Sequence, residues 1–194
     1  MQHAVTQPIP PFKTADGRLE IHGIPVWVDN LSWLAVCTRT GAAVVIDGPE
    51  APPVLAKCAA LGAELTGVLN THVHGDHVGV NQGLAKLGLL GGLTVCGPAK
   101  QAAKVPGLTR GVGEGDRVQI GAVEGQVWLT EGHQDGHVSF VFGDALFCGD
   151  TLFAGGCGYL FDGPPAKMHA SLQRLMTLDG ATRAFCAHEY TQDN

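Results

Sequence analysis

The sequence has no apolar run that reaches the roughly 18 residues of a membrane-spanning helix. Residues 1–11 lack the basic start and the apolar core of a secretory signal. Charged residues make up only 15% of the chain, the formal net charge is −6, and Lys and Arg never cluster. A surface for nucleic acid is therefore not expected. Since 45% of the residues are hydrophobic, general disorder is excluded as well.

Cysteine is scarce and scattered, with 6 residues and no C-x-x-C motif. In a chain of 194 residues this pattern is typical of reduced thiols rather than of a disulfide framework, and it predicts a cytoplasmic protein. The 28 glycines follow no fixed period, which excludes collagen. The length favours a single domain that covers residues 1–194.

The hydrophobic pattern predicts a mixed α/β fold. Apolar residues recur at helical spacing over residues 52–61, before Gly62, and again over residues 165–178. Strands are expected at residues 24–28, 33–38, 42–46, 66–70, 118–120, 123–130, 138–142, 145–148 and 183–186. The first half, with its strand–helix–strand order, favours parallel pairing, and the second half favours an antiparallel meander. We expect two β-sheets packed face to face with helices on the outside.

Histidine is abundant, with 9 residues, and several lie near aspartate. The segment 72–77 reads H-x-H-x-D-H and follows the expected strand 66–70. In an extended chain His72 and His74 project to the same side, and a bend at Gly75 would turn Asp76 and His77 toward a second point nearby. This density of potential ligands predicts a metal-binding loop.

Three further candidate ligands stand where expected strands end, namely His133, Asp150 and His188. A single histidine at a strand end is usually structural. Three such positions in a chain that also contains the H-x-H-x-D-H segment favour convergence on one metal centre.

These residues together resemble the metallo-β-lactamase superfamily, of which H-x-H-x-D-H is the defining motif. The stretch 149–158 and the His-Glu-Tyr-Thr run at 188–191 are more specifically similar to the glyoxalase II, or hydroxyacylglutathione hydrolase, family. The resemblance implies an αββα sandwich of two mixed sheets. It also implies two divalent metal ions, one held by His72, His74 and His133 and the other by Asp76, His77 and His188, with Asp150 as the bridge.

Zinc is the first choice for these ions. Iron or manganese is the alternative, because imidazole and carboxylate ligands do not select strongly among the three metals. The implied activity is hydrolysis of a thioester, S-acylglutathione, with S-D-lactoylglutathione as the expected substrate. A metal-bridging hydroxide would attack the carbonyl carbon and release a hydroxy acid and glutathione.

Several residues are expected to assist this reaction. Asp76 would orient the hydroxide in addition to ligating metal. His137 would either support the ligands from behind or cap the turn before the strand 138–142. Tyr159, Phe161 and Tyr190 are the candidate substrate contacts.

The chain departs from the family at three places. Tyr159 stands where the family has Lys or Arg, and Glu131 stands where it has Pro. The family also continues beyond the His-Glu-Tyr-Thr run with a helical domain that carries basic residues, whereas this sequence ends at Asn194. Fewer cations for an anionic glutathione thioester should raise KM more than they lower kcat.

Two other functions compete with this one. The first is another hydrolase of the superfamily, a lactonase or a β-lactamase. Asp150 argues against a β-lactamase, because class B lactamases usually lack the bridging aspartate. The second is a persulfide dioxygenase with a single iron, and the complete ligand set argues against it. The sequence leaves the oligomeric state open.

Overall fold

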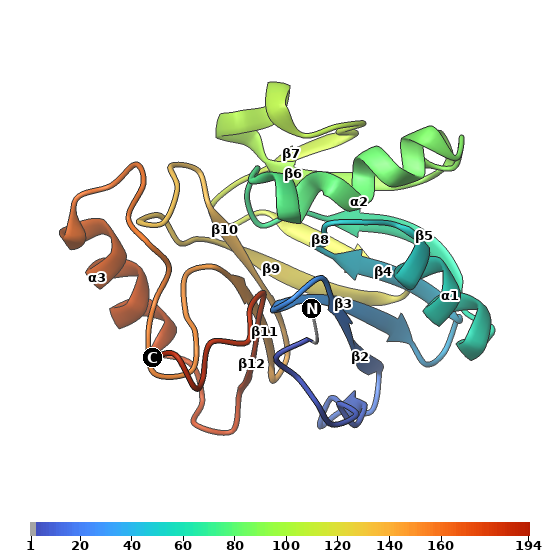
Figure 1. Cartoon of the computed structure of the whole chain (residues 1–194), viewed down its shortest axis with the longest axis horizontal. Coiled ribbons are helices and arrows are strands. Elements are labelled where there is room, and N and C mark those ends of the chain that lie inside the picture. Colours follow the sequence, from blue (N-terminus) through green and yellow to red (C-terminus); the bar gives the residue numbers. More distant parts are fainter. Residues whose placement is uncertain (1–2) are drawn as a thin grey trace.

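The computed structural model describes residues 3–194, so Met1 and Gln2 of the opening segment lie outside the described residues. Two β-sheets pack against each other and carry helices on their outer faces (Figure 1). One sheet has 7 strands in the order β1-β2-β3-β4-β5-β6-β7, and the other has 5 in the order β12-β11-β10-β9-β8. This arrangement confirms the expected αββα sandwich.

The seven-stranded sheet consists of β1 (Phe12–Lys13), β2 (Leu19–Val26), β3 (Asn30–Cys37), β4 (Ala42–Ile46), β5 (Glu64–Leu69), β6 (Thr94–Pro98) and β7 (Arg110–Val112). The five-stranded sheet consists of β8 (Arg117–Ile120), β9 (Val123–Leu129), β10 (Val138–Phe142), β11 (Ala145–Gly149) and β12 (Arg183–Cys186). The helices are α1 (Pro52–Leu61), α2 (Gly75–Lys86) and α3 (Pro165–Leu175), with short 3₁₀ turns η1 (Leu90–Gly92) and η2 (Ala99–Lys104).

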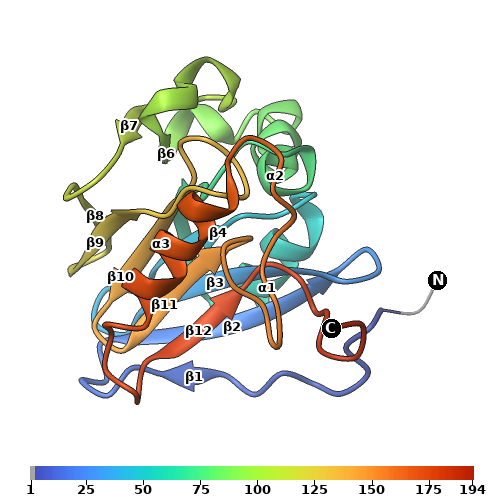
Figure 2. The ribbon, with the colours of Figure 1, turned by 90° about the vertical axis from the view of Figure 1, so that its left-hand side faces the viewer.

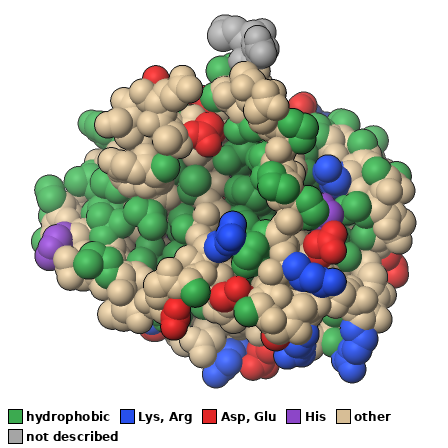
Figure 3. All heavy atoms as spheres, turned by 90° about the horizontal axis from the view of Figure 1, so that it is seen from below, with side chains coloured by type: hydrophobic (Ala, Val, Ile, Leu, Met, Phe, Trp, Pro, Cys, Tyr) green, Lys and Arg blue, Asp and Glu red, His purple; other side chains and the backbone are tan. Residues whose placement is uncertain are grey.

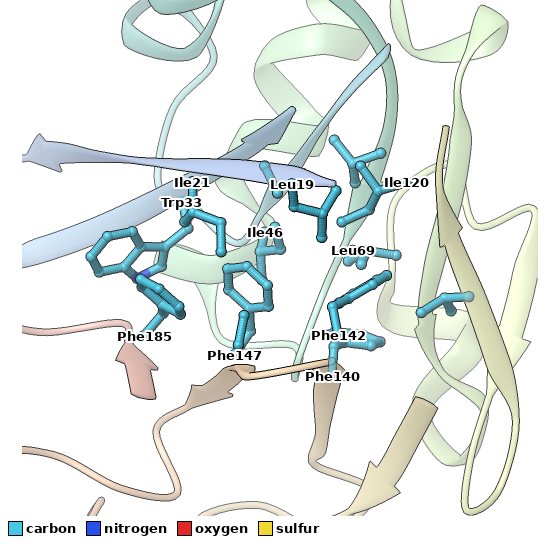
Figure 4. Close-up of a cluster of buried hydrophobic side chains, with 14 of the residues drawn as sticks. Leu19, Ile21, Trp33, Ile46, Leu69, Ile120, Phe140, Phe142, Phe147 and Phe185 are labelled. Atoms are coloured by element: carbon cyan, nitrogen blue, oxygen red, sulfur yellow. The ribbon is translucent and has the colours of Figure 1, made fainter. Parts of the chain in front are cut away.

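The main core lies between the two sheets. Alternate residues of β3, such as Trp33 and Ala35, point into it, while Leu34 points to the opposite face. Phe140, Phe142, Phe147 and Phe185 enter from the five-stranded sheet, and Figure 4 shows them facing the aliphatic side chains of the other sheet. Because side chains of both sheets are interleaved here, each sheet needs the other to bury its inner face.

Two outer clusters attach the helices. Val54 of α1 and Val80 of α2 pack with Val45 and Val68 on the outer face of the seven-stranded sheet. On the other side, Leu175 of α3 packs against the outer face of the five-stranded sheet. Figure 2 shows α3 in front of β10, β11 and β12, with α1 and α2 behind. Strands covered on both faces explain the nearly continuous apolar stretches in the sequence.

Most expected elements are present. Helix α1 has the predicted limits, and Gly62 ends it in the left-handed conformation with φ 61°. Helix α3 begins as predicted and ends earlier, at Leu175. The strands from β8 to β11 form the expected antiparallel meander, and β4 and β5 pair in parallel.

The segment 72–77 differs from the prediction, because α2 starts within it at Gly75. The sequence did not predict this helix because it contains several glycines, which are poor helix formers. A Cβ on Gly79 would lie 2.1 Å from the carbonyl oxygen of Pro49, and one on Gly83 would lie 2.9 Å from Cβ of Ala51. Tertiary packing of α2 onto this segment therefore decides both its sequence and its fold.

An apolar hollow of about 500 Å³ lies beside the end of α3, where Met176 is exposed. Figure 3 shows hydrophobic side chains gathered on this face of the molecule.

All 6 cysteines are free thiols, and Cys157 is the exposed one. Among residues 3–194, no helix combines the length and the hydropathy needed to cross a bilayer.

Candidate metal centre

The first group of candidate ligands is His72, His74 and His133. The Nδ1 atom of His74 lies 3.0 Å from Nε2 of His72 and 3.0 Å from Nε2 of His133. The three side chains come from the end of β5, the start of α2 and the end of β9. Segments far apart in the sequence therefore bring three imidazole nitrogens to one point.

The second group is Asp76, His77 and His188. The Oδ2 atom of Asp76 lies 3.5 Å from Nε2 of His77 and 3.3 Å from Nε2 of His188. Asp76 and His77 belong to the first turn of α2, and His188 follows β12.

Asp150 lies between the two groups. Its Oδ2 atom is 3.4 Å from Nε2 of His133, in the first group. Its Oδ1 atom is 3.5 Å from Nε2 of His77 and 3.6 Å from Nε2 of His188, in the second. One carboxylate thus faces both groups, each with a different oxygen. All of the metal ligands expected from the sequence are brought together at this centre.

The donor atoms fit bound metal. Two ligands at about 2.1 Å from a tetrahedral ion lie roughly 3.4 Å apart, close to the separations within both groups. Nε2 of His77 and Oδ1 of Asp150 are buried and have no hydrogen-bond partner. Buried polar atoms without partners are costly, so their presence indicates that a cation belongs there. Imidazole and carboxylate donors make this a site for divalent metal.

In each imidazole, the outer nitrogen is the one that faces away from the centre. The hydrogen bond that it makes fixes the tautomer of the ring. Nδ1 of His133 lies 2.8 Å from the carbonyl oxygen of Tyr159. Nδ1 of His72 lies 3.1 Å from Oγ1 of Thr71, whose own proton goes to Asp47. An outer nitrogen that donates a hydrogen bond leaves the lone pair on the inner one, as a metal ligand requires.

Local backbone geometry places the ligands. His74 is extended, with φ −64° and ψ 151°, and precedes the first turn of α2. Gly149, at φ 49°, makes the turn before Asp150. A Cβ there would lie 2.4 Å from Oγ1 of Thr71 and 2.8 Å from Nε2 of His137. The glycine at this strand end is thus needed for both its conformation and its small size.

His137 is fully buried beside the ligands. Its Nε2 atom accepts a hydrogen bond from the backbone N–H of Asp150 at 3.2 Å, and its ring stacks on His72 with centroids 5.0 Å apart. His137 also directly precedes β10.

Aromatic rings surround the ligands on the open side. Phe161 is exposed and packs edge-on against the rings of His74 and His133, with centroids 5.0 and 5.3 Å apart. Tyr159 is 74% exposed and contacts Phe161. Tyr190 stacks on His188 at 5.0 Å. All three candidate substrate contacts therefore border the centre.

Burial lowers the pKa of His72, His74 and His133, which keeps these imidazoles neutral and ready to bind metal. Burial alone would raise the pKa of Asp76, but the facing imidazoles of His188 and His77 outweigh it and hold that pKa far below its usual range. Asp76 is consequently ionised at neutral pH.

Burial would also lower the pKa of His77 and His188, but the facing carboxylates prevail. Asp150 and Asp47 raise the pKa of His77, and a hydrogen bond with Asp76 raises that of His188. Both shifts favour the protonated form of these imidazoles in the protein alone.

Sequence reasoning missed the residues behind the second group. Oδ2 of Asp47 lies 3.1 Å from Nδ1 of His77, and Oδ1 of Asp29 lies 2.9 Å from Nδ1 of His188. Asn30 donates to Oδ2 of Asp76 at 2.9 Å. A signal existed for Asp47, which follows a strand as the other ligands do. Asp29 lies in a short turn and Asn30 begins β3, and their sequence gave none.

Comparisons with known proteins agree with this geometry. Residues 88–188 match the family model described as the metallo-beta-lactamase superfamily. A hydroxyacylglutathione hydrolase from Rhodospirillum rubrum is 47% identical over 91% of this chain, which spans 68% of that relative.

Two solved structures share the fold. The crystal structure of ETHE1 from Myxococcus xanthus has a TM-score of 0.71 and 32% identity, and the match covers 83% of this chain and 71% of that one. The crystal structure of TTHA1623 in a di-iron-bound form has a TM-score of 0.62 and 28% identity, with 93% and 92% covered. The chain therefore belongs to the metallo-β-lactamase superfamily and, within it, to the hydroxyacylglutathione hydrolase family.

Proposed function

We propose that this protein is a binuclear metal-dependent thioester hydrolase. It would cleave S-acylglutathione, with S-D-lactoylglutathione as the first candidate, into a hydroxy acid and glutathione. The observation that carries the proposal is Asp150, whose two oxygens face two different sets of ligands. The substrate class comes from the relatives named hydroxyacylglutathione hydrolase, at 40 to 47% identity.

The proposed ligands are those of the sequence interpretation. His72, His74 and His133 would hold one ion, Asp76, His77 and His188 the other, and Asp150 both. When bound, a pair of divalent ions supplies an activated water at neutral pH and stabilises negative charge on the carbonyl oxygen. No serine or cysteine nucleophile is then required.

Asp76 has a second proposed role. Its carboxylate is ionised, so it could accept a hydrogen bond from the attacking water and orient it toward the carbonyl carbon. His137 would hold Asp150 in place through the backbone N–H that it binds. The leaving group is a thiolate, whose parent thiol has a pKa near 8.5, so the site needs no strong general acid.

The aromatic border suits the organic part of a thioester. Phe161 lies against two ligands of the first group and offers an apolar contact. Tyr159 and Tyr190 each add a hydroxyl. Tyr159 contacts Phe161, beside the first group, and Tyr190 stacks on His188 of the second group. A small thioester could thus bind with its carbonyl at the metals and its remainder along these rings.

We propose zinc as the native metal, with iron or manganese as alternatives. The absence of thiolate from the ligand groups leaves the choice open on chemical grounds. The di-iron form of the related TTHA1623 supports iron as a serious alternative.

The free cysteines support a cytoplasmic location, and the core shared by both sheets supports one domain over residues 1–194.

The decisive experiment is a substrate panel on protein whose metal content has been measured. Release of free thiol from S-D-lactoylglutathione is expected, with little turnover of nitrocefin or of a homoserine lactone. Turnover of the lactone alone would make the protein a lactonase with the same metal centre. One iron per chain together with sulfur oxidation would instead assign it as a dioxygenase.

A further inference from the structure

The two groups of ligands are supported by different chemistry. In the first group, the outer nitrogens of His72 and His133 face a hydroxyl and a backbone carbonyl. In the second group, the outer nitrogen of His77 faces Asp47 and that of His188 faces Asp29. Neutral acceptors thus stand behind one group, and carboxylates stand behind the other.

Asp29 reaches the second group from a distant part of the chain. It lies in the tight turn between β2 and β3, where Trp27 has a φ of 58°. Its Oδ1 atom lies 2.9 Å from Nδ1 of His188. The next residue, Asn30, donates its side-chain N–H to Oδ2 of Asp76 at 2.9 Å. Two consecutive residues, Asp29 in the turn and Asn30 at the start of β3, therefore each contact a ligand of the same group.

The backbone fixes this turn against the segment that carries His188. The N–H of Glu189 donates to the carbonyl oxygen of Asp29 at 2.9 Å, and the N–H of Leu31 donates to that of Ala187 at 2.7 Å. Asn30 and His188 form an antiparallel bridge. These bonds set the carboxylate of Asp29 in place independently of the contact with the imidazole.

The contact has a direct chemical consequence. A carboxylate that accepts the Nδ1 proton leaves the lone pair of His188 on Nε2, which points toward Asp76 and Asp150 at 3.3 and 3.6 Å. It also makes the imidazole more basic, and hence a stronger ligand. Asn30 meanwhile holds one oxygen of Asp76, so that the carboxylate keeps a single orientation.

We propose that Asp29 and Asn30 are positioning residues that govern binding at the second group selectively. The inference rests on the proposed metal pair. Neither residue touches His72, His74 or His133 in any hydrogen bond or ion pair of the described residues. Loss of Asp29 should therefore weaken metal binding at the second site while the first retains its affinity.

The test measures metal rather than activity. The as-purified holoprotein, Asp29→Ala and Asp29→Asn are dialysed against zinc buffers of increasing chelator strength, and metal per chain is counted. Asp29→Ala is expected to lower the affinity for one of the two ions by 10 to 100-fold, the usual effect of losing a hydrogen-bond partner of a ligand. Asp29→Asn keeps an acceptor for the Nδ1 proton, and it should recover most of the affinity.

Asp144→Asn is the matched control, because this aspartate also lies in a turn between strands and accepts a backbone N–H, from Ala15. Asn30→Ala should weaken the same ion as Asp29→Ala. The proposal is overturned if Asp29→Ala keeps both ions at unchanged affinity or loses both in parallel. Since metal counts decide the matter, a lack of thioesterase activity would overturn the proposed function and leave this result intact.

Discussion

His77 and Asp150 face each other across the centre, with Nε2 and Oδ1 3.5 Å apart, and neither atom has a hydrogen-bond partner. Both side chains are buried. Burial of polar atoms without a hydrogen-bond partner destabilises the folded state, and a cation bound between the two atoms would remove this destabilisation. Several consequences of this arrangement can be measured.

Replacement of Asp150 by Ala should abolish the shared ligand. Metal content is expected to fall toward one ion per chain, and kcat/KM for the thioester should fall by about a thousand-fold or more, equivalent to roughly 4 kcal/mol of transition-state stabilisation. Elemental analysis and thiol release measure both. Asp144→Ala, at the opposite end of β11, is the matched control. A variant that kept both ions and the full rate would refute Asp150 as the bridge.

Removal of metal should destabilise the fold. Any ion that binds only the native state stabilises it by about 2.7 kcal/mol at a hundred times its Kd. For a chain of this size that corresponds to roughly 5–10 °C in Tm. Calorimetry before and after chelation measures the shift, and metal added back should reverse it. Asp150→Ala should show a smaller shift, and an equal one would argue against the role of Asp150.

Glu131 should make the loop that carries His133 sensitive to acid. Burial raises the pKa of its carboxyl, but hydrogen bonds from Lys100 and from the N–H of Gly136 outweigh that and lower it below the usual value. Its folded-state pKa is thus below its unfolded one. The stabilisation is full above the usual Glu pKa, near 4.3, and is lost as pH falls through the lower folded-state value.

Glu131→Gln should therefore cost about 1–2 kcal/mol of unfolding free energy at pH 7 and much less at pH 3. Urea unfolding of the metal-free protein at both pH values measures this difference. Glu124→Gln is the control, since this residue pairs with Arg117 on the exposed surface. A Glu131→Gln effect that stayed constant with pH would show that shape, rather than charge, matters in the loop.

Gly149 should not tolerate a methyl group. Ala at φ 49° is strained, and its Cβ would also press on Thr71 and His137. Gly143 has a similar φ of 58°, but a Cβ on it would meet no neighbouring atom within 4 Å. Gly143→Ala should cost about 1–2 kcal/mol, and Gly149→Ala about 2 kcal/mol more. Equal losses in urea unfolding would mean that the crowding around Gly149 is relieved easily.

The sequence predicted the ligands better than their local structure. The H-x-H-x-D-H segment and the strand-end positions of His133, Asp150 and His188 predicted side chains that lie together in the structure. Helix α2 was missed because Gly79 and Gly83 weaken its helical signal, and only close packing against residues 49–51 explains them. Local propensity cannot reveal a helix whose sequence is set by a neighbouring segment.

The supporting residues were hidden for a different reason. Asp29 contacts a histidine 159 positions away, and Asn30 contacts Asp76, 46 positions away. Nothing in the sequence of a short turn indicates which distant side chains it will contact. The pairing of β3 with the segment after β12 brings Asp29 to His188, and the packing of α2 brings Asp76 to Asn30, so both contacts arise only in the folded chain.

Tyr159 offers a test of substrate binding. The family has Lys or Arg at this position, and the tyrosine is 74% exposed, so its replacement should leave the fold unchanged. Tyr159→Lys should supply a cation for an anionic glutathione thioester and lower KM by roughly 3 to 10-fold, as expected for about 1 kcal/mol of added binding, with kcat unchanged. Initial rates at low and high ionic strength measure the effect. Tyr159→Phe separates charge from the hydroxyl, and a decrease in KM that persisted at high salt would show that the lysine acts by another route.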